Sequence, residues 1–313
     1  MDKHMLNNTQ TTVTSLQHIL QQYSFLTLVT SHDLYPNSKG TGLPLIQVQT
    51  PLCNAVIALQ GAQLLQFSTA NEKPLLWLSP HCDFTAGVAL RGGIPICLPW
   101  FGINANDPKK PKHGFARNQI WQLSSAALSI DGAAELCFSF TSQANNLFGF
   151  NFLAELKMTL GNSAKLELSV KNTSVNPLTC SWALHSYYPV SSLSEVRVKG
   201  LAGKKYLDNL ENYAEKTQHD DVHFTGEVDR VFYNIDNSLT IVGSPNIAIT
   251  HNNCPSVVVW NPGANAANIA DIGAGNEQGY ICVERGAVLQ EKWNLEAGEN
   301  RSAWMKLEER SES

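Results

Sequence analysis

Short segments of alternating polar and apolar residues, separated by turn-forming residues, recur along most of this chain. Residues 155–172, ELKMTLGNSAKLELSVKN, show the pattern on both sides of a Gly161-Asn162-Ser163 break. A period of two is typical of a β-strand with one buried and one solvated face, and the break predicts a hairpin turn. This stretch therefore predicts two antiparallel strands.

Comparable segments follow one another with Gly, Asn and Pro between them: NAVIALQGAQLLQFST (54–69), AELCFSFTS (134–142), SEVRVKG (194–200), LTIVG (239–243), SVVVW (256–260) and GYICVE (279–284). Many short strands with little helical periodicity favour an all-β fold, a large antiparallel β-sandwich or a barrel. The helical exception is TSLQHILQQYSF (14–25), with Thr14 or Ser15 as the N-cap. We therefore expect an N-terminal extension with a short helix (1–40) and a single β-sandwich domain (41–313).

The composition narrows the possible partners. Of the 313 residues 43% are hydrophobic, enough for a core, while 22 Lys and Arg stand against 27 Asp and Glu, for a formal charge of −5. Such a chain lacks the positive electrostatic potential that would bind nucleic acid or an anionic membrane. Its first residues lack the apolar stretch of a signal peptide, and it has no run of about eighteen apolar residues. We expect a folded cytoplasmic protein that binds neither nucleic acid nor membrane.

The seven cysteines are scattered, odd in number and never spaced as a CxxC pair. Most lie among apolar neighbours, as in GIPICLPW and YICVE, where a free cysteine behaves as a small hydrophobic residue. The sequence thus predicts neither a disulfide framework nor a zinc cluster.

One segment departs from the strand pattern: ALRGGIPICLPWFGINANDPKKPKHGFARNQIW, residues 89–121. Its Gly and Pro residues surround Arg91, His113 and Arg117, so its backbone must consist of loops and bends. Long irregular segments in a compact domain usually carry function. The alternative is a surface excursion whose arginines pair with carboxylates. Two glycines directly after Arg91 favour function, because they allow another backbone or a ligand to come close.

Seven motifs, in order along the chain, carry a resemblance to a known family: LRGGIPICLPWFG, KHGFARNQIW, SWALHSYYPV, VKGLAGKKYLDNL, VDRVF, VVWNPG and YICVERG. From about residue 40 to residue 305 the chain resembles the glucose-6-phosphate 1-epimerase (hexose-6-phosphate mutarotase) branch of the aldose 1-epimerase superfamily. The resemblance implies a galactose mutarotase-like β-sandwich with a sugar bound in a cleft on one concave sheet. It also implies a monomer that needs no metal and no organic cofactor.

A histidine lies in the middle of CSWALHSYYPV (180–190), which reads as one strand. The resemblance implies that this residue, His185, is the general acid and that Glu284 in YICVERG is the general base. Mutarotation needs such a pair, because one group takes the proton of the anomeric hydroxyl while another protonates the ring oxygen. Taken alone, a strand histidine is more often a hydrogen-bonded core residue, whereas Glu284 in an apolar segment needs solvent or a partner. Arg285 is expected on the opposite face of the strand.

The resemblance also implies how a substrate is held. Arg91 and Arg117 match phosphate-binding positions, and guanidinium groups suit a dianion because they form paired, charge-assisted hydrogen bonds. Asp229 in EVDRVF matches an aspartate that accepts hydrogen bonds from sugar hydroxyls. Lys112 stands where related enzymes commonly have glutamine, and it either adds a charge near the phosphate or points away. His113 either contacts the sugar or supports Arg117.

The resulting hypothesis is a cofactor-independent mutarotase that interconverts the α and β anomers of glucose 6-phosphate and related hexose 6-phosphates. One alternative is an aldose 1-epimerase for unphosphorylated sugars, in which the two arginines would lack their anion. A second alternative is a non-catalytic sugar-phosphate-binding protein, which has no need of a matched acid and base. A glycosidase or polysaccharide lyase requires a longer open cleft and usually further domains.

Overall fold

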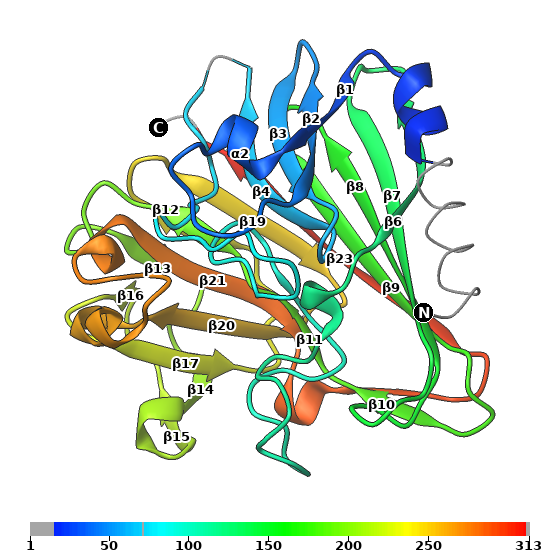
Figure 1. The fold of residues 1–313 in the computed structure, drawn as a ribbon. Coiled ribbons are helices and arrows are strands. Elements are labelled where there is room, and N and C mark those ends of the chain that lie inside the picture. Colours follow the sequence, from blue (N-terminus) through cyan, green and yellow to red (C-terminus); the bar gives the residue numbers. More distant parts are fainter. Residues whose placement is uncertain (1–15, 71, 311–313) are drawn as a thin grey trace.

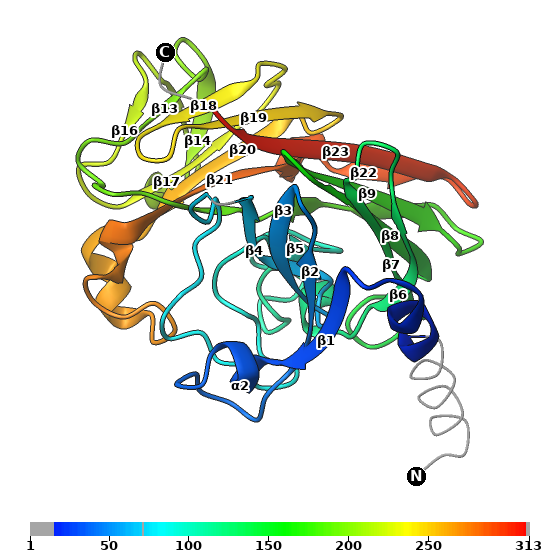
Figure 2. The same ribbon diagram turned by 90° about the horizontal axis from the view of Figure 1, so that it is seen from above.

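The computed structural model of the protein describes residues 16–70 and 72–310. Antiparallel strands dominate it, and helical segments are few and short (Figure 1). The strands form one sheet of nine and one of eight, a four-stranded sheet and a two-stranded ribbon. Figure 2 shows the two large sheets arching over the four-stranded sheet and over loops drawn in cyan. The prediction of an all-β sandwich is confirmed.

The nine-stranded sheet contains the predicted hairpin. Its strands, in spatial order, are β16 (Val222–His223), β13 (Arg197–Lys199), β18 (Leu239–Val242), β19 (Ile247–Asn252), β23 (Asn300–Glu309), β9 (Ala164–Asn172), β8 (Phe152–Leu160), β7 (Ala134–Ser142) and β6 (Gln122–Leu128). The hairpin is formed by β8 and β9, in which Leu156 lies opposite Leu168. Every second residue of both strands is buried, because one face packs on the core and the other meets water.

The eight-stranded sheet is centred on a strand that is buried along its whole length. Its path is β15 (Ala214–Thr217), β14 (Lys205–Asp208), β17 (Val228–Phe232), β20 (Ser256–Asn261), β21 (Tyr280–Ala287), β11 (Trp182–Leu184) and β5 (Ile96–Cys97), while β12 (Tyr187–Pro189) also pairs with β21. All eight residues of β21 are buried. A charged side chain on β21 is therefore far from bulk water and needs a local partner.

The smaller elements complete the fold. The four-stranded sheet consists of β1 (Leu26–Thr30), β2 (Pro44–Gln49), β3 (Cys53–Ala58) and β4 (Gln63–Thr69), and the ribbon of β10 (Leu178–Cys180) and β22 (Trp293–Leu295). Helical turns are found at residues 16–22, α2 (Ser31–Leu34), Ala116–Asn118, Asn209–Glu211, Gly263–Asn268, Asn276–Gly279 and Leu289–Glu291. In the two described ranges, every helix is too short or too polar to cross a membrane.

The N-terminal part is helical where expected. Residues 16–22 form a helix within the predicted range, whereas the proposed caps Thr14 and Ser15 lie outside the described residues. Strand β1, which falls in the predicted extension, pairs with β2 over all five of its residues. The division of the chain at residue 40 stays a prediction, but Leu26–Thr30 belongs to the four-stranded sheet.

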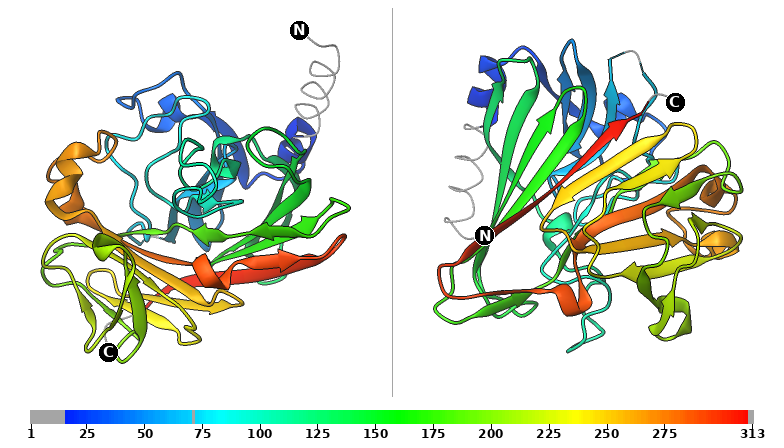
Figure 3. Two further views of the ribbon diagram at one scale, coloured as in Figure 1. Left: turned by 90° about the horizontal axis from the view of Figure 1, so that it is seen from below. Right: turned by 180° about the vertical axis from the view of Figure 1, so that it is seen from behind.

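All the larger sheets contribute to one main hydrophobic core. Its largest buried side chains include Trp121, Phe138, Phe152 and Trp182. Burying a side chain of this kind contributes about 1.5 to 3 kcal/mol to folding. Seen from behind in Figure 3, the red strand β23 runs beside the green strands of the nine-stranded sheet, and β23 pairs with β9. The core thus holds the curved sheets together behind the face that carries the candidate site.

The irregular segment 89–121 contains only β5 and the helical turn Ala116–Asn118 as regular elements. The two glycines after Arg91 have positive φ values of 117° and 60°. A Cβ atom on Gly93 would lie 2.2 Å from the carbonyl oxygen of Leu64, and one on Gly92 would lie 2.6 Å from Leu78 Cα. These glycines therefore make room for neighbouring backbone, and this close packing fixes the chain on which Arg91 stands.

Arg285 lies on the face of β21 opposite to Glu284, as expected from the alternation of side chains. It is fully buried, and its guanidinium donates hydrogen bonds to the carbonyl oxygens of Ile235 at 3.1 Å, Cys254 at 3.4 Å and Asn237. Burial lowers the pKa of Arg285 to about 10. Backbone carbonyls, rather than carboxylates, thus hold this buried cation.

Candidate active site

His185 and Glu284, far apart in sequence, lie in contact. The Nε2 atom of His185 is 3.4 Å from Oε1 of Glu284, and the two side chains are only 7% and 1% exposed. Strand pairing brings them together, because β11 and β12 both pair with β21 and His185 lies between them. His185 Nδ1 and Glu284 Oε2 are buried and make no hydrogen bond to protein. Each group therefore has one buried polar atom that no protein group satisfies.

The prediction that residues 180–190 form one strand is wrong. The structure divides this stretch between the end of β10, β11 and β12, and leaves His185 and Ser186 outside the strands. The cause is local, because Ser186 donates to the carbonyl oxygen of Leu184 through both its N–H at 2.9 Å and its Oγ at 3.1 Å. These short-range bonds compete with ladder bonds and interrupt the strand. His185 lies at this interruption, where its side chain contacts Glu284.

Burial shifts both members of the pair toward their neutral forms. It raises the pKa of Glu284 well above the ordinary value, and the charge of Asp229 adds to the shift. It also lowers the pKa of His185, and the positive charges of Arg117 and Arg91 act in the same direction. Both shifts favour the form of the pair in which Glu284 carries a proton and His185 is neutral.

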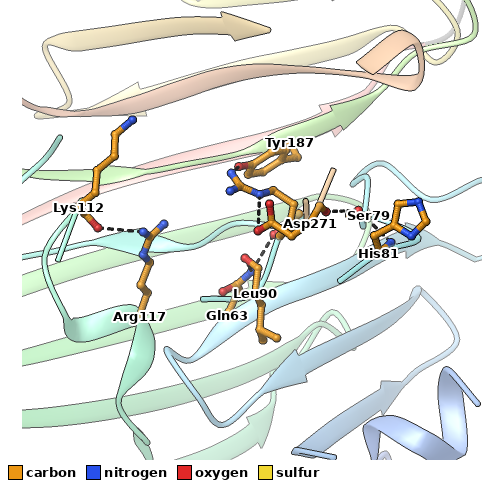
Figure 4. Close-up of polar contacts among 10 residues, drawn as sticks. Gln63, Ser79, His81, Leu90, Lys112, Arg117, Tyr187 and Asp271 are labelled. Carbon is orange, nitrogen blue, oxygen red and sulfur yellow. Dashed lines mark hydrogen bonds and ion pairs between the residues drawn. The ribbon is translucent and has the colours of Figure 1, made fainter. Parts of the chain in front are cut away.

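Arg91 reaches the histidine through Tyr187. Its Nη1 donates to the Tyr187 hydroxyl at 2.8 Å, and its Nε lies 3.0 Å from Oδ2 of Asp271. The Tyr187 ring is stacked on the His185 ring. Buried Gln63 donates to the carbonyl oxygens on both sides of Arg91, those of Leu90 at 3.3 Å and Gly92 at 2.7 Å (Figure 4). The arginine is therefore held at its backbone and at its guanidinium.

Arg117 and Lys112 lie together on the irregular segment, apart from Tyr187 and Asp271 in Figure 4. Arg117 Nη2 donates to the carbonyl oxygen of Lys112 at 2.9 Å, while its buried Nε has no hydrogen-bond partner. No carboxylate of residues 16–70 or 72–310 forms an ion pair with either side chain. Arg91 thus pairs with a carboxylate, as the alternative interpretation of this segment expected, whereas Arg117 does not.

His113 packs against the catalytic candidate. Its ring lies edge-on to that of His185 with centroids 5.5 Å apart. The N–H of Gly102 donates to His113 Nδ1 at 3.2 Å, and the N–H of His113 donates to the Gly102 carbonyl at 2.7 Å. Burial, together with the charge of His185, lowers the pKa of His113. The imidazole is therefore neutral at ordinary pH, with its proton on Nε2.

Asp229 lies on the same face of the eight-stranded sheet as Glu284. It stands opposite Trp260, which stands opposite Cys282, two residues before Glu284 on β21. Asn209 donates to Asp229 Oδ2 at 2.6 Å, yet burial raises the pKa of Asp229. The carboxylate keeps acceptor capacity on its second oxygen.

The structure therefore brings the predicted residues to one region, and adds two that the sequence did not indicate. Asp271 and Asn209 hold Arg91 and Asp229 respectively. Asp271 lies 180 residues from Arg91 in an irregular segment, so neither spacing nor periodicity pointed to it. Among the described side chains, no group of three or more His, Cys, Asp or Glu residues is arranged to hold a metal ion.

Comparison with known proteins places these features in a family. The sequence model of the aldose 1-epimerase family matches residues 44–308. Proteins of Salmonella typhimurium and Escherichia coli (strain K12), both named "Putative glucose-6-phosphate 1-epimerase", are 36% and 34% identical over 251 and 249 residues, each covering 77% of this chain and 82% of the relative.

A solved structure shares the fold. The crystal structure of a Salmonella typhimurium protein described as a "putative mutarotase" superposes with a TM-score of 0.80 at 30% identity, covering 86% of this chain and 91% of that one. The family match extends from β2 to β23 and so includes every candidate site residue. The chain belongs to the aldose 1-epimerase family.

Proposed function

We propose that the protein is a mutarotase that interconverts the α and β anomers of hexose 6-phosphates such as glucose 6-phosphate. The observation that carries the proposal is the buried contact of 3.4 Å between His185 and Glu284. An acid and a base at this separation can act on two neighbouring oxygen atoms of one sugar ring. A protein that only bound sugar phosphates would gain nothing from burying such a pair.

One proton on the pair of His185 and Glu284 is sufficient for the reaction. With its proton on His185, the pair presents an ionised Glu284, which takes the proton of the anomeric hydroxyl while the imidazolium protonates the ring oxygen. The ring opens to an aldehyde, which turns about its C1–C2 bond. With the proton now on Glu284, the two groups exchange roles and close the ring on the other face. No net proton enters or leaves the pair.

The cations near the pair support a phosphorylated substrate. Burial lowers the pKa of His185, and the charges of Arg117 and Arg91 lower it further. A phosphate dianion bound beside them would offset their charge, and would thereby favour the imidazolium that ring opening needs. Arg117 and Lys112, which have no carboxylate partner among the described residues, are the strongest candidates for contact with the phosphate. An unphosphorylated sugar would leave both charges uncompensated.

Asp229 and His113 are assigned to the sugar. Asp229 has a free carboxylate oxygen on the same face as Glu284 and would accept hydrogen bonds from hydroxyl groups. His113, neutral and with Nε2 as the donor, would donate to a sugar oxygen or hold the His185 ring from its edge. Neither role requires a metal or an organic cofactor.

We place this activity in the cytoplasm and expect a monomer. All seven cysteines are free, which is typical of a reducing compartment. The proposed substrate is a small metabolite, and the formal charge of −5 gives no basis for nucleic-acid or membrane binding.

The proposal is tested by measuring anomer exchange of glucose 6-phosphate by NMR magnetisation transfer, with and without catalytic amounts of protein. Glucose and galactose are measured alongside, and the spontaneous rates are subtracted. Acceleration confined to the sugar phosphate is the expected result. Faster exchange of the neutral sugars would favour an unphosphorylated-aldose epimerase, and no acceleration of any sugar would leave a binding protein.

A further inference from the structure

The carboxylate of Asp271 compensates one of the two arginines of the site. Asp271 lies in the irregular stretch between the helical turns Gly263–Asn268 and Asn276–Gly279. Its Oδ2 lies 3.0 Å from Nε of Arg91, and the two side chains are 31% and 24% exposed. This ion pair is therefore partly shielded from water, so its charges are felt more strongly than those of a surface pair.

The backbones of both partners are tied to the same serine. Ser79 Oγ donates to the carbonyl oxygen of Asp271 at 2.6 Å, and the N–H of Ser79 donates to the carbonyl oxygen of Arg91 at 3.0 Å (Figure 4). The segment that carries the carboxylate is thus docked independently of the carboxylate itself. A change of the Asp271 side chain can remove its charge and leave the segment in place.

The guanidinium of Arg91 is partly committed before any substrate arrives. Nε faces Asp271 and one N–H of Nη1 donates to Tyr187, which leaves Nη2 and the second N–H of Nη1 for a ligand. The two arginines consequently differ: Arg91 has a counter-ion, whereas Arg117 has none among the described residues. A phosphate dianion that approaches Arg91 is repelled by the nearby charge of Asp271, whereas a neutral sugar hydroxyl is not.

We propose that Asp271 is a specificity-determining residue, which limits the preference of the site for phosphorylated over unphosphorylated sugars by neutralising Arg91. This inference rests on the proposed function, in that it assigns Arg91 to the end of the sugar that carries the phosphate. With the aspartate present, Arg91 keeps a partner when the ligand is neutral. Without it, the arginine becomes a stronger anion site.

The test is Asp271→Asn, which keeps the shape and an acceptor oxygen for Arg91 Nε but removes the charge. Binding of inorganic phosphate is measured by calorimetry, and kcat/KM by anomer exchange of glucose 6-phosphate and of glucose. We expect the affinity for inorganic phosphate to rise on the order of tenfold. The ratio of kcat/KM for glucose 6-phosphate to kcat/KM for glucose should rise by a similar factor. The rise should shrink at high salt. Asp271→Ser, smaller and also neutral, serves as a second variant if the first does not fold.

Ser79→Ala is the matched control, because it loosens the segment but keeps the carboxylate. It should leave the ratio between the two sugars unchanged. Unchanged phosphate affinity in Asp271→Asn, equal losses on both sugars, or the same shift in Ser79→Ala would each overturn the inference. If the wild-type protein accelerates no anomer exchange while Asp271→Asn still binds phosphate more tightly, the proposed function fails and the charge compensation stands.

Discussion

The ring of Tyr187 lies parallel to the ring of His185, with centroids 4.9 Å apart and an angle of 8° between the planes. The tyrosine is itself fixed, since its hydroxyl accepts from Arg91 and its backbone bonds to Gly93 and Trp77. The imidazole plane is therefore set by packing before a sugar binds. An imidazole held in this way would need little reorganisation to transfer a proton.

Loss of either member of the acid–base pair should remove most of the activity. We expect His185→Ala and Glu284→Gln each to lower kcat by about a hundred- to ten-thousand-fold, because one proton transfer then depends on water. Anomer exchange of glucose 6-phosphate is the measurement, with circular dichroism to verify that each variant is folded. Near-wild-type turnover in either variant would show that the roles are assigned wrongly.

Tyr187→Phe should have a much smaller effect. It keeps the stacked ring and removes only the hydrogen bond from Arg91 Nη1, which contributes about 0.5 to 1.5 kcal/mol. We expect kcat to fall about two- to tenfold. Tyr187→Ala removes the stacking partner as well and should cost more. Equal kcat values for the two variants would contradict a role for the stacked ring.

The pH dependence of kcat/KM should show a broad plateau around neutrality. Activity requires one proton on the pair, so it is lost in acid only below the lowered pKa of His185, where the pair gains a second proton. It is lost in alkali only above the raised pKa of Glu284, where the pair has none. An acid limb near the ordinary histidine pKa of 6.5 would contradict this account.

Glu284→Gln should stabilise the fold, and more so as the pH rises. Because the folded state raises the pKa of this carboxyl group, the unfolded chain releases its proton first as the pH climbs above the ordinary value of 4.5. The free energy of unfolding of the wild type therefore decreases as the pH rises from that value to the raised pKa. The glutamine variant has no carboxyl group at this position and does not lose stability in this way. Urea denaturation should show a larger gain for the variant at about pH 8 than at about pH 5.

Glu195→Gln is the control for that measurement, because Glu195 is exposed and the change also removes one carboxylate. Its effect on stability should be small at both pH values, as is usual for an exposed side chain. If the gain of Glu284→Gln were the same at both pH values, burial of the charged form would not be the cause.

Arg117→Ala should damage turnover of glucose 6-phosphate far more than turnover of glucose. A hydrogen bond to a charged group contributes about 1.5 to 3 kcal/mol, so KM for the sugar phosphate should rise about ten- to a hundredfold. Lys109→Ala removes an exposed cation from the same loop and should change neither sugar appreciably. Equal losses on both sugars in Arg117→Ala would remove the assignment of this arginine to the phosphate.

The sequence predicted the sheets where a regular pattern repeats. The β8–β9 hairpin follows from the alternation around residues 161–163, since a half-buried antiparallel pair must alternate. Burial on both faces hides such a pattern, and β21 is buried throughout, so periodicity alone could not identify it as the centre of a sheet. The interruption at His185 depends on bonds of Ser186, which a propensity for strand formation does not reveal.

The residues of the candidate site could be predicted only where they belong to a recognisable motif. The resemblance indicated His185 and Glu284, and the structure brings them into contact, although their catalytic roles stay predictions. Asp271 had no such signal, because it is joined to Arg91 only by the folding of two irregular segments. Contacts of this kind follow from the path of the chain in space, which neither composition nor spacing records.

Glu284 and Arg285 lie on opposite faces of β21, and this arrangement helps to determine the register in which the strand pairs. A one-residue slip of this strand would turn Glu284 toward the carbonyl oxygens of Ile235 and Cys254, which offer a carboxylate no donor. It would also drive the guanidinium of Arg285 into the face that carries the candidate site. Burying an unpaired charge costs several kcal/mol, whereas the apolar run YICV would tolerate the shift. The buried guanidinium of Arg285 thus helps to fix the register of β21, because a slipped strand would leave its charge without these carbonyl partners.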